Sequence, residues 1–356
     1  MGIKMKRKMM ATVVAMAMTA VMVTGCGNAT NETTENAQGG TVYKVGIVQY
    51  VDDASLNQIE KAIEAELDAK GAELGVTFDY ANYTHNGQAD STVLNQIAAD
   101  LMADEVDVII PIATPAAMVI QNATADVTTA DGGMIPVVFS AVSDPVGAGL
   151  VASNEAPGAN ITGTSDAIDT EGIMKLIVTV DPDTDKIGLL YDKSQPSSAG
   201  SIEDAKVYCD ANGIAYVEKT GTTTAEVQAA ADSLVAEGVD AIFTPQDNTI
   251  MTAELAIFEK FTEAGIPHYT GADSFALNGA FCGYGVNYEN LGTATADMVV
   301  EILINGAEPT TTAVKTLEDG IITINTETAE AIGLDYTVLK ELGSELVEIT
   351  TAAEFN

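Results

Sequence analysis

Hydroxyl and carboxylate side chains follow several short apolar runs of this 356-residue sequence, at points where a strand would end and a helix begin. The first is Thr114, which is followed by Pro115 and Ala116 after the apolar run 106–112. Proline is favoured at the first position of a helix and threonine just before it, so we expect Thr114 to cap a helix. Its hydroxyl, the free N–H groups of the first turn and the positive helix end would bind an anion such as a ligand carboxylate. The alternative is that Thr114 caps the helix and binds no ligand.

A second hydroxyl follows the next apolar run, 135–139. Ser140 and the backbone of Ala141 are placed to hydrogen-bond the same anionic group, because ligands bind outside the carboxyl ends of parallel strands. The one Arg of the sequence is Arg7. The bidentate fork that often holds a carboxylate is therefore not available beyond the N-terminus, and hydroxyl and N–H groups would replace it.

Carboxylates occupy the corresponding places in the second half of the chain. Asp247, with Asn248 beside it, follows the run 241–244, and Asp273 follows 268–271. Asp166 is a third candidate. A carboxylate removed from water is a good partner for an ammonium group, although Asp247 could instead cap the next helix. These residues favour an α-amino acid as the ligand, with its carboxylate on the first half and its ammonium on the second.

Tyrosines at strand ends could contact the ligand's side chain, and Gln195 could reach across from one half of the protein to the other. The candidates are Tyr50, Tyr83, Tyr191 and Tyr284. Each of them could equally be packed at the surface.

The elements that position these residues follow from an alternation of short apolar runs with segments of helical period. The run 44–49 predicts a strand, and the segment 55–74 predicts a helix with Leu56, Ile59 and Ile63 on one face. Further strands are expected at 76–80, 106–112, 135–139, 186–191, 215–218, 241–244 and 268–271, and further helices at 91–103, 115–125, 201–211, 224–237, 249–264 and 291–304. Short strands and a helical region would end the chain. Strands separated by helices predict two α/β lobes with doubly wound parallel sheets.

The N-terminal segment has the pattern of a bacterial lipoprotein signal. Basic residues precede the apolar run 9–22, which has the length of a signal peptide and is shorter than a membrane span of about 20 residues. The letters VTGC (23–26) resemble a lipobox, so we expect 1–25 to be removed and Cys26 to be lipidated; an ordinary signal peptide is the alternative. Residues 26–40 are typical of a flexible tether. The protein would then be anchored to the outer face of the cell membrane.

The composition disfavours several classes of function. Asp and Glu number 52 against 15 Lys and Arg, a net charge of −37, which argues against nucleic acid as a partner. Cys209 and Cys282 lack metal-ligand spacing and only two His are present, so we expect no metal and no other cofactor. The two cysteines would be buried thiols, with a disulfide as the alternative. No nucleophile elbow, phosphate-binding loop or zinc-protease motif occurs, so we do not expect an enzyme.

Several motifs occur in the order found in one family. They are NGQAD (86–90), TPAA (114–117), SAVSDPV (140–146), NITGTSD (160–166), PQDN (245–248) and GVNY (285–288) with Gly292. Over residues 42–335 the sequence resembles the solute-binding lipoproteins of ABC importers in the type I periplasmic-binding class, in the group of tryptophan- and tyrosine-type receptors. The resemblance implies two lobes joined by a three-stranded hinge: 41–162 with 287–313, and 163–286 with 314–356. It also implies a receptor, expected to be monomeric, that closes on a ligand and delivers it to a membrane permease and its ATPase.

One segment departs from the family. The loop after the first strand carries YVDDAS (50–55) where much of the family has Glu and His. The resemblance therefore does not by itself assign the family's typical ligand to this protein. The leading hypothesis is an extracytoplasmic, lipid-anchored receptor for an amino acid with an aromatic or large apolar side chain. The alternatives are a receptor for a nucleoside or sugar, and a sensory ectodomain that feeds a membrane kinase.

Overall fold

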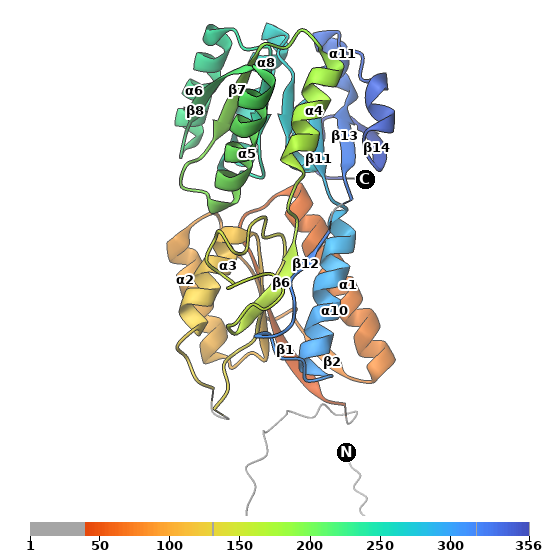
Figure 1. Cartoon of the computed structure of the whole chain (residues 1–356). Coiled ribbons are helices and arrows are strands. Elements are labelled where there is room, and N and C mark those ends of the chain that lie inside the picture. Colours follow the sequence, from red (N-terminus) through yellow and green to blue (C-terminus); the bar gives the residue numbers. More distant parts are fainter. Residues whose placement is uncertain (1–39, 130–131, 318, 356) are drawn as a thin grey trace, which may run out of the picture. The chain divides into compact units, whose positions relative to one another are not determined.

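A seven-stranded sheet forms the centre of the first lobe in this computed structural model, which describes residues 40–129, 132–317 and 319–355 (Figure 1). The strand order is β12-β6-β5-β4-β1-β2, with β3 also paired to β1, and all pairings are parallel. The strands are β1 (Val42–Gln49), β2 (Thr77–Asp79), β3 (Thr84–Asn86), β4 (Val108–Ile112), β5 (Val137–Phe139), β6 (Ile161–Ser165) and β12 (Lys315–Thr316). The helices are α1 (Ala54–Leu74), α2 (Ser91–Ala103), α3 (Thr114–Thr124) and α10 (Tyr288–Leu303).

The second lobe is built around another seven-stranded sheet, of order β14-β13-β11-β10-β9-β7-β8. Its pairings are parallel except that β13 runs antiparallel to β11. The strands are β7 (Lys186–Tyr191), β8 (Ala215–Thr220), β9 (Ala241–Thr244), β10 (His268–Thr270), β11 (Cys282–Gly285), β13 (Ile321–Asn325) and β14 (Glu345–Ile349). The helices are α4 (Thr170–Val180), α5 (Pro196–Asn212), α6 (Thr224–Glu237), α7 (Asn248–Ala253), η1 (Glu254–Ala256), α8 (Phe258–Ala264), α9 (Asp273–Leu277), α11 (Thr326–Ile332) and η2 (Thr337–Glu341).

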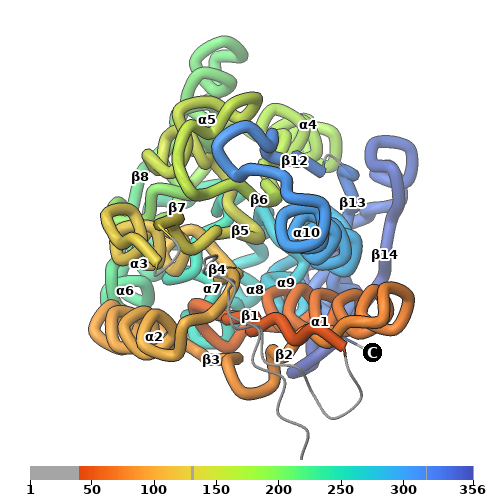
Figure 2. The backbone as a smooth tube through the Cα atoms, turned by 90° about the horizontal axis from the view of Figure 1, so that it is seen from below, coloured from red at the N-terminus to blue at the C-terminus, as the bar shows by residue number. Residues whose placement is uncertain are grey.

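Helices cover both faces of each sheet. In the first lobe α1 packs beside α10 on one face, and α2 beside α3 on the other (Figure 2). In the second lobe α4 packs on α5, while α6 packs on α7 and α8. Two doubly wound α/β lobes were predicted from the alternating pattern, and this architecture is confirmed.

Local sequence signals explain where the helices begin and end. In α1 the predicted face of Ile59, Ile63 and Leu67 is fully buried against the first sheet. Asp53 caps this helix by accepting hydrogen bonds from the N–H groups of the next turn, and Gly75 ends it with a φ of 71°. The same signals thus place the loop that precedes α1 at the edge of the sheet.

Two predicted helical segments differ in the structure. The expected helix 249–264 is divided into α7, η1 and α8. The division coincides with Glu254, which is fully buried and directs Oε1 to Nδ1 of His268 at 3.0 Å. The predicted terminal helical region is present as α11 and η2, but a strand that was not predicted, β14, follows it and continues the second sheet beside β13.

The chain passes between the lobes three times, after β6, after β11 and between β12 and β13. Strand β6 continues to Ser165 within the first sheet, and β12 extends that sheet to Thr316. These strands therefore reach three residues beyond the predicted lobe limits at 162 and 313. The crossing segments after β6 and β11 are short, covering 166–169 and 286–287, and they join the first lobe to the second.

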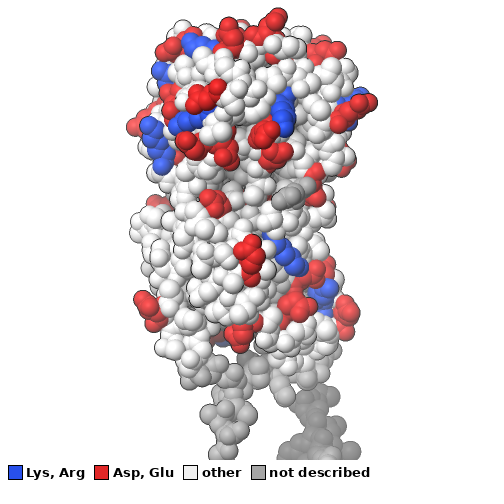
Figure 3. Space-filling model, in the orientation of Figure 1, with Lys and Arg blue, Asp and Glu red and all other residues white. Residues whose placement is uncertain are grey.

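Acidic side chains are scattered over the face shown in Figure 3, with lysines between them. Cys209 and Cys282 are free and buried, so the prediction of buried thiols is confirmed. Within the described residues, no helix has both the length and the apolar character needed to cross a bilayer. Cys26 and the segments 1–25 and 26–39 lie outside the described residues.

Candidate functional site

A cavity of about 40 Å³ lies where the strand ends of the two lobes face each other. This volume is well below the roughly 300–1,000 Å³ of a typical small-molecule site, so the two lobes lie against each other with little space between them. The polar residues that line it are Asp53, Ser55, Thr114, Ser143, Asp166, Ser197, Gln246, Asp247, Asn248 and Ser274. The apolar lining consists of Leu56, Ala113, Ala141, Met251, Ala272, Phe275 and Tyr288. Both lobes therefore contribute to a single site.

The turn from β4 into α3 places a hydroxyl on the cavity. Thr114 is the first residue of α3 rather than its cap, which corrects the sequence-based expectation. The cap position belongs to Ala113, whose φ of 80° makes the sharp turn from strand to helix. No side chain caps α3, and Oγ1 of the buried Thr114 has no hydrogen-bond partner in the described part of the chain.

Ser140 lies behind the cavity wall. Its hydroxyl is hydrogen-bonded to Oγ1 of Thr164 at 3.2 Å and of Thr295 at 2.9 Å, so it joins β5 to β6 and α10. Ala141, with a φ of 55°, does line the cavity. Ala116 is fully buried among the apolar residues of the first lobe and is not part of the lining.

Two carboxyl groups face the cavity from the first lobe and the first crossing segment. Asp53 uses Oδ1 to cap α1, and its buried Oδ2 has no partner among the described residues. Burial raises the pKa of Asp53 to about 6. Asp166 accepts a 3.1 Å hydrogen bond from the Ser143 hydroxyl, and burial likewise raises its pKa to about 6. Both groups would be stabilised by a cation.

Asp247 lines the cavity from the second lobe, but the protein already uses both of its oxygens. Oδ1 caps α7 by accepting from the N–H groups of Thr249 and Ile250. Oδ2 accepts from the Asp192 N–H and the Ser198 hydroxyl, each at 2.7 Å. Burial raises the pKa of Asp247 to about 6. The capping role considered for Asp247 in the sequence is thus present in the structure.

The other candidates of the second lobe lie around this loop. The amide of Asn248, a lining residue, donates a 3.3 Å hydrogen bond to Oε1 of Gln195. Gln195 itself does not line the cavity and lies within hydrogen-bonding reach of Tyr50 from the first lobe. Tyr191 directs its hydroxyl to Glu218 at 2.7 Å, outside the lining. 

Asp273 contacts the first lobe directly. Its Oδ1 accepts a 2.6 Å hydrogen bond from the Ser55 hydroxyl at the start of α1. Burial, with a smaller contribution from the charge of Asp53, raises the pKa of Asp273 to about 7. Asp273 is adjacent to the lining residue Ser274 but is not itself part of the lining.

Unpartnered polar atoms gather at the cavity. In the described part of the chain, four buried side-chain atoms on its lining have no hydrogen-bond partner: Asp53 Oδ2, Thr114 Oγ1, Ser197 Oγ and Gln246 Oε1. Buried polar groups of folded proteins are nearly always hydrogen-bonded, so such a group of atoms indicates a ligand site. Ser197 and Gln246 were missed in the sequence, although Gln246 lies within one of the family-like motifs.

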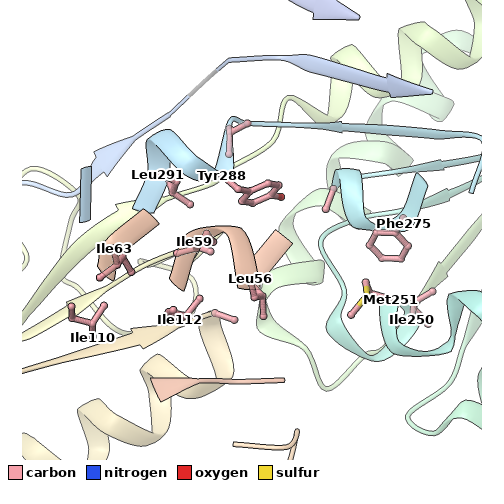
Figure 4. Close-up of a cluster of buried hydrophobic side chains, with 14 of the residues drawn as sticks. Leu56, Ile59, Ile63, Ile110, Ile112, Ile250, Met251, Phe275, Tyr288 and Leu291 are labelled. Carbon is pink, nitrogen blue, oxygen red and sulfur yellow. The ribbon is translucent and has the colours of Figure 1, made fainter. Parts of the chain in front are cut away.

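An apolar wall completes the site. Leu56 and Tyr288 approach it from the first lobe, and Met251 and Phe275 from the second (Figure 4). Tyr288 begins α10 and is buried, with three nearby acids, Asp53, Asp166 and Asp273, contributing to its raised pKa. None of these four apolar residues was predicted from the sequence to contact a ligand, because each also fits the apolar face of a helix. In the described residues, no group of three or more His, Cys, Asp and Glu is arranged to hold a metal ion.

Known proteins share this architecture. Residues 44–343 match the model of the ABC transporter substrate binding protein family. A tyrosine-binding protein of Clostridioides difficile is 31% identical over 335 residues, which are 92% of this chain and 93% of that protein. These matches are to binding proteins and agree with the prediction that the chain is not an enzyme.

Solved structures agree with the family model. A Streptococcus pneumoniae ABC domain in complex with L-Trp is 30% identical, with a TM-score of 0.77 over 86% of this chain and all of that one. The ligand-free, open structure of a substrate-binding protein with adhesive properties from Clostridium difficile is 31% identical, with a TM-score of 0.65 over 87% of this chain and all of that one. The two-lobe α/β fold of the type I periplasmic-binding class is thus shown, and the chain belongs to the family of ABC transporter substrate-binding proteins.

Proposed function

We propose that this protein is the lipid-anchored, extracytoplasmic binding component of an ABC importer and closes its two lobes on an amino acid with an aromatic or large apolar side chain. The observation that carries the proposal is the set of unpartnered polar atoms on one cavity, contributed by both lobes. A ligand that satisfies atoms on both lobes favours the state in which the lobes are together. Cys26 would carry the lipid, and a permease with its ATPase would receive the ligand.

The acids favour an ammonium group on the ligand. Asp53 offers an unpartnered Oδ2, and Asp166 stands nearby at the first crossing segment. No Lys, Arg or His is among the described residues that line the cavity. An ammonium group would therefore bring the missing positive charge and lower the pKa of both carboxyls. A neutral sugar would leave these charges without a counterion.

The start of α3 favours a carboxylate at the opposite end of the ligand's head group. Oγ1 of Thr114 is a free donor, and the first N–H groups of this 11-residue helix carry partial positive charge. Together with the acids, this arrangement suits an α-amino acid, whose two charges have opposite sign. The carboxylate would be held without Arg, as the composition requires.

The apolar wall favours a large hydrophobic side chain. Leu56, Met251 and Phe275 give the lining an apolar surface, against which an aromatic ring would exchange water for apolar contacts once the lobes open enough to admit it. The similar proteins support this choice, because one is named for tyrosine binding and another was solved with L-Trp.

Thermal-shift measurements with the twenty amino acids, a set of nucleosides and a set of neutral sugars test the proposal. We expect one or more aromatic or large apolar amino acids to raise the melting temperature and the sugars and nucleosides to leave it unchanged. Asp53→Asn should abolish most of the shift, while Asp52→Asn at the exposed neighbouring position should keep it. Stabilisation by a sugar or nucleoside and by no amino acid would refute the amino-acid assignment.

A further inference from the structure

The starts of helices α1 and α9 meet across the boundary between the lobes. The Ser55 hydroxyl in α1 donates a 2.6 Å hydrogen bond to Oδ1 of Asp273, and the Ser274 N–H donates to the Ser55 hydroxyl oxygen at 3.3 Å. Ser55 belongs to the first lobe, and Asp273 and Ser274 belong to the second. These bonds join the lobes and would be broken if the lobes separated.

The same contact brings two carboxyl groups of like charge together. Asp53 caps α1 through Oδ1, leaving Oδ2 buried and unpartnered in the described structure. Burial raises the pKa of Asp273, and the charge of Asp53 adds to this shift. Asp53 is buried and Asp273 is half-buried where the lobes touch.

The surrounding groups do not neutralise this pair. The other titratable side chains that face it are the Asp166 carboxyl, from the segment after β6, and the Tyr288 hydroxyl, from the start of α10. Neither carries positive charge. Two carboxylates held together away from water destabilise each other unless one is protonated or a cation lies between them. Joining the lobes with both groups ionised is therefore unfavourable without a ligand.

We propose that Asp53 and Asp273 form a charge gate that keeps the ligand-free lobes apart and lets them close when a ligand ammonium group binds Asp53 and offsets the negative charge of the pair. Ser55 then completes closure through its bond to Asp273. This inference rests on the proposed function for the identity of the cation, and it assigns Asp273 a positioning role in closure. Asp53 faces the ligand, while Asp273 lies across the boundary and is affected by the ligand's charge only electrostatically.

Removing the charge of Asp273 should close the lobes as ligand binding does. Asp273→Asn retains an oxygen that can accept from Ser55 but removes the repulsion, so the variant should close without ligand. Small-angle X-ray scattering at pH 8 on the ligand-free, full-length protein tests this without labels. We expect its radius of gyration to fall below the value of the ligand-free wild type, while Asp52→Asn should keep the wild-type value. An Asp273→Asn protein as open as wild type, or a wild type already closed without ligand, would overturn the gate.

Acidification supplies a second measurement that needs no variant. The ligand-free wild type should close between pH 8 and pH 5.5 as protons occupy the pair, and the Asp53→Asn/Asp273→Asn double variant should be closed at both pH values. A wild type whose radius of gyration is the same at both pH values would contradict the gate. Neither measurement uses an amino acid, so failure of the gate is distinguishable from failure of the amino-acid assignment, which the thermal shifts report.

Discussion

The Ser198 hydroxyl donates a 2.7 Å hydrogen bond to Oδ2 of Asp247. This bond, together with the donors from Asp192 and the first turn of α7, gives the buried Asp247 carboxylate a structural role at the edge of the cavity. The ammonium of a ligand therefore has a better partner in Asp53, whose Oδ2 is unpartnered within the described residues. The sequence favoured Asp247 for the ammonium, whereas the hydrogen-bond partners in the structure favour Asp53.

Asp247→Asn should lower the stability of the protein more than it lowers ligand affinity. The new amide nitrogen cannot accept the hydrogen bonds now made to Oδ2, so we expect the free energy of unfolding to fall by about 1–3 kcal/mol. Urea unfolding measures this loss, with Asp204→Asn on the exposed face of α5 as the control. An unchanged unfolding free energy combined with a larger affinity loss than that of Asp53→Asn would show that Asp247 binds the ligand.

Thr114→Val should lower ligand affinity more than it lowers the stability of the protein. Valine has nearly the shape of threonine, and Oγ1 of Thr114 has no partner in the described chain, so ligand-free stability should not decrease. Ligand affinity should fall by roughly 1–3 kcal/mol, because a bond to a charged group is lost. Calorimetric titration checks the affinity.

Thr124→Val in the same helix is the matched control for this change. The Thr124 hydroxyl donates to the Ile120 carbonyl oxygen and accepts from the Asn160 amide, away from the cavity. This variant should therefore lose stability and keep its affinity. Equal affinity losses in the two variants would mean that Thr114 has no direct contact with the ligand.

Stability and affinity should respond to pH in opposite directions. Burial raises the pKa of Asp53 and Asp166 to about 6 and of Asp273 to about 7, above the unfolded value near 4. The folded state then binds more protons than the unfolded state, so the contribution of these groups to stability is complete below pH 4 and is lost as pH rises towards 7. A ligand ammonium prefers the ionised acids, so its affinity should increase over pH 5–7.5. Ligand binding that weakens as pH rises would contradict this assignment of the ammonium.

The C-terminal segment should slow opening only slightly. Glu354, which follows the second sheet, accepts a 3.1 Å hydrogen bond from Asn57 of α1 and lies 3.5 Å from Nζ of Lys61. These side chains are exposed, so Glu354→Gln should speed ligand dissociation by less than about fivefold. Stopped-flow displacement measures the rate, with Glu348→Gln, whose partner Tyr336 lies in the same lobe, as the control. A tenfold or larger increase in the dissociation rate would show that the contacts of Glu354 determine the rate of opening.

Local sequence signals predicted the elements and the edge on which the site lies. Thr114 and Asp247 lie at turns between a strand and a helix, and Ala141 lies in the loop that follows β5. The position of each side chain was less predictable. Ser140 lies one residue from a cavity residue yet faces Thr164 and Thr295, because the direction of a side chain depends on the backbone of the turn.

Contacts between the lobes could not be read from local patterns. Ser55 and Asp273 are 218 residues apart, and their hydrogen bond depends on how two separate sheets face each other. Phe275 and Tyr288 fit the apolar faces of helices, so the sequence contains no signal that they also line a cavity. The side of the site that holds the ammonium was expected from Asp247 and Asp273, whereas the unpartnered oxygen belongs to Asp53.

The central claim is that buried carboxylates hold the ammonium of an amino acid, and calorimetric titration of the wild type tests it most directly. L-tyrosine and L-tryptophan should each be compared with the analogue that lacks the amino group but keeps the carboxylate and the ring. We predict that at least one of the two amino acids binds and that its deaminated analogue binds about 10- to 150-fold more weakly, the loss expected for a hydrogen-bonded charge. Equal affinity of an amino acid and its analogue would contradict the account.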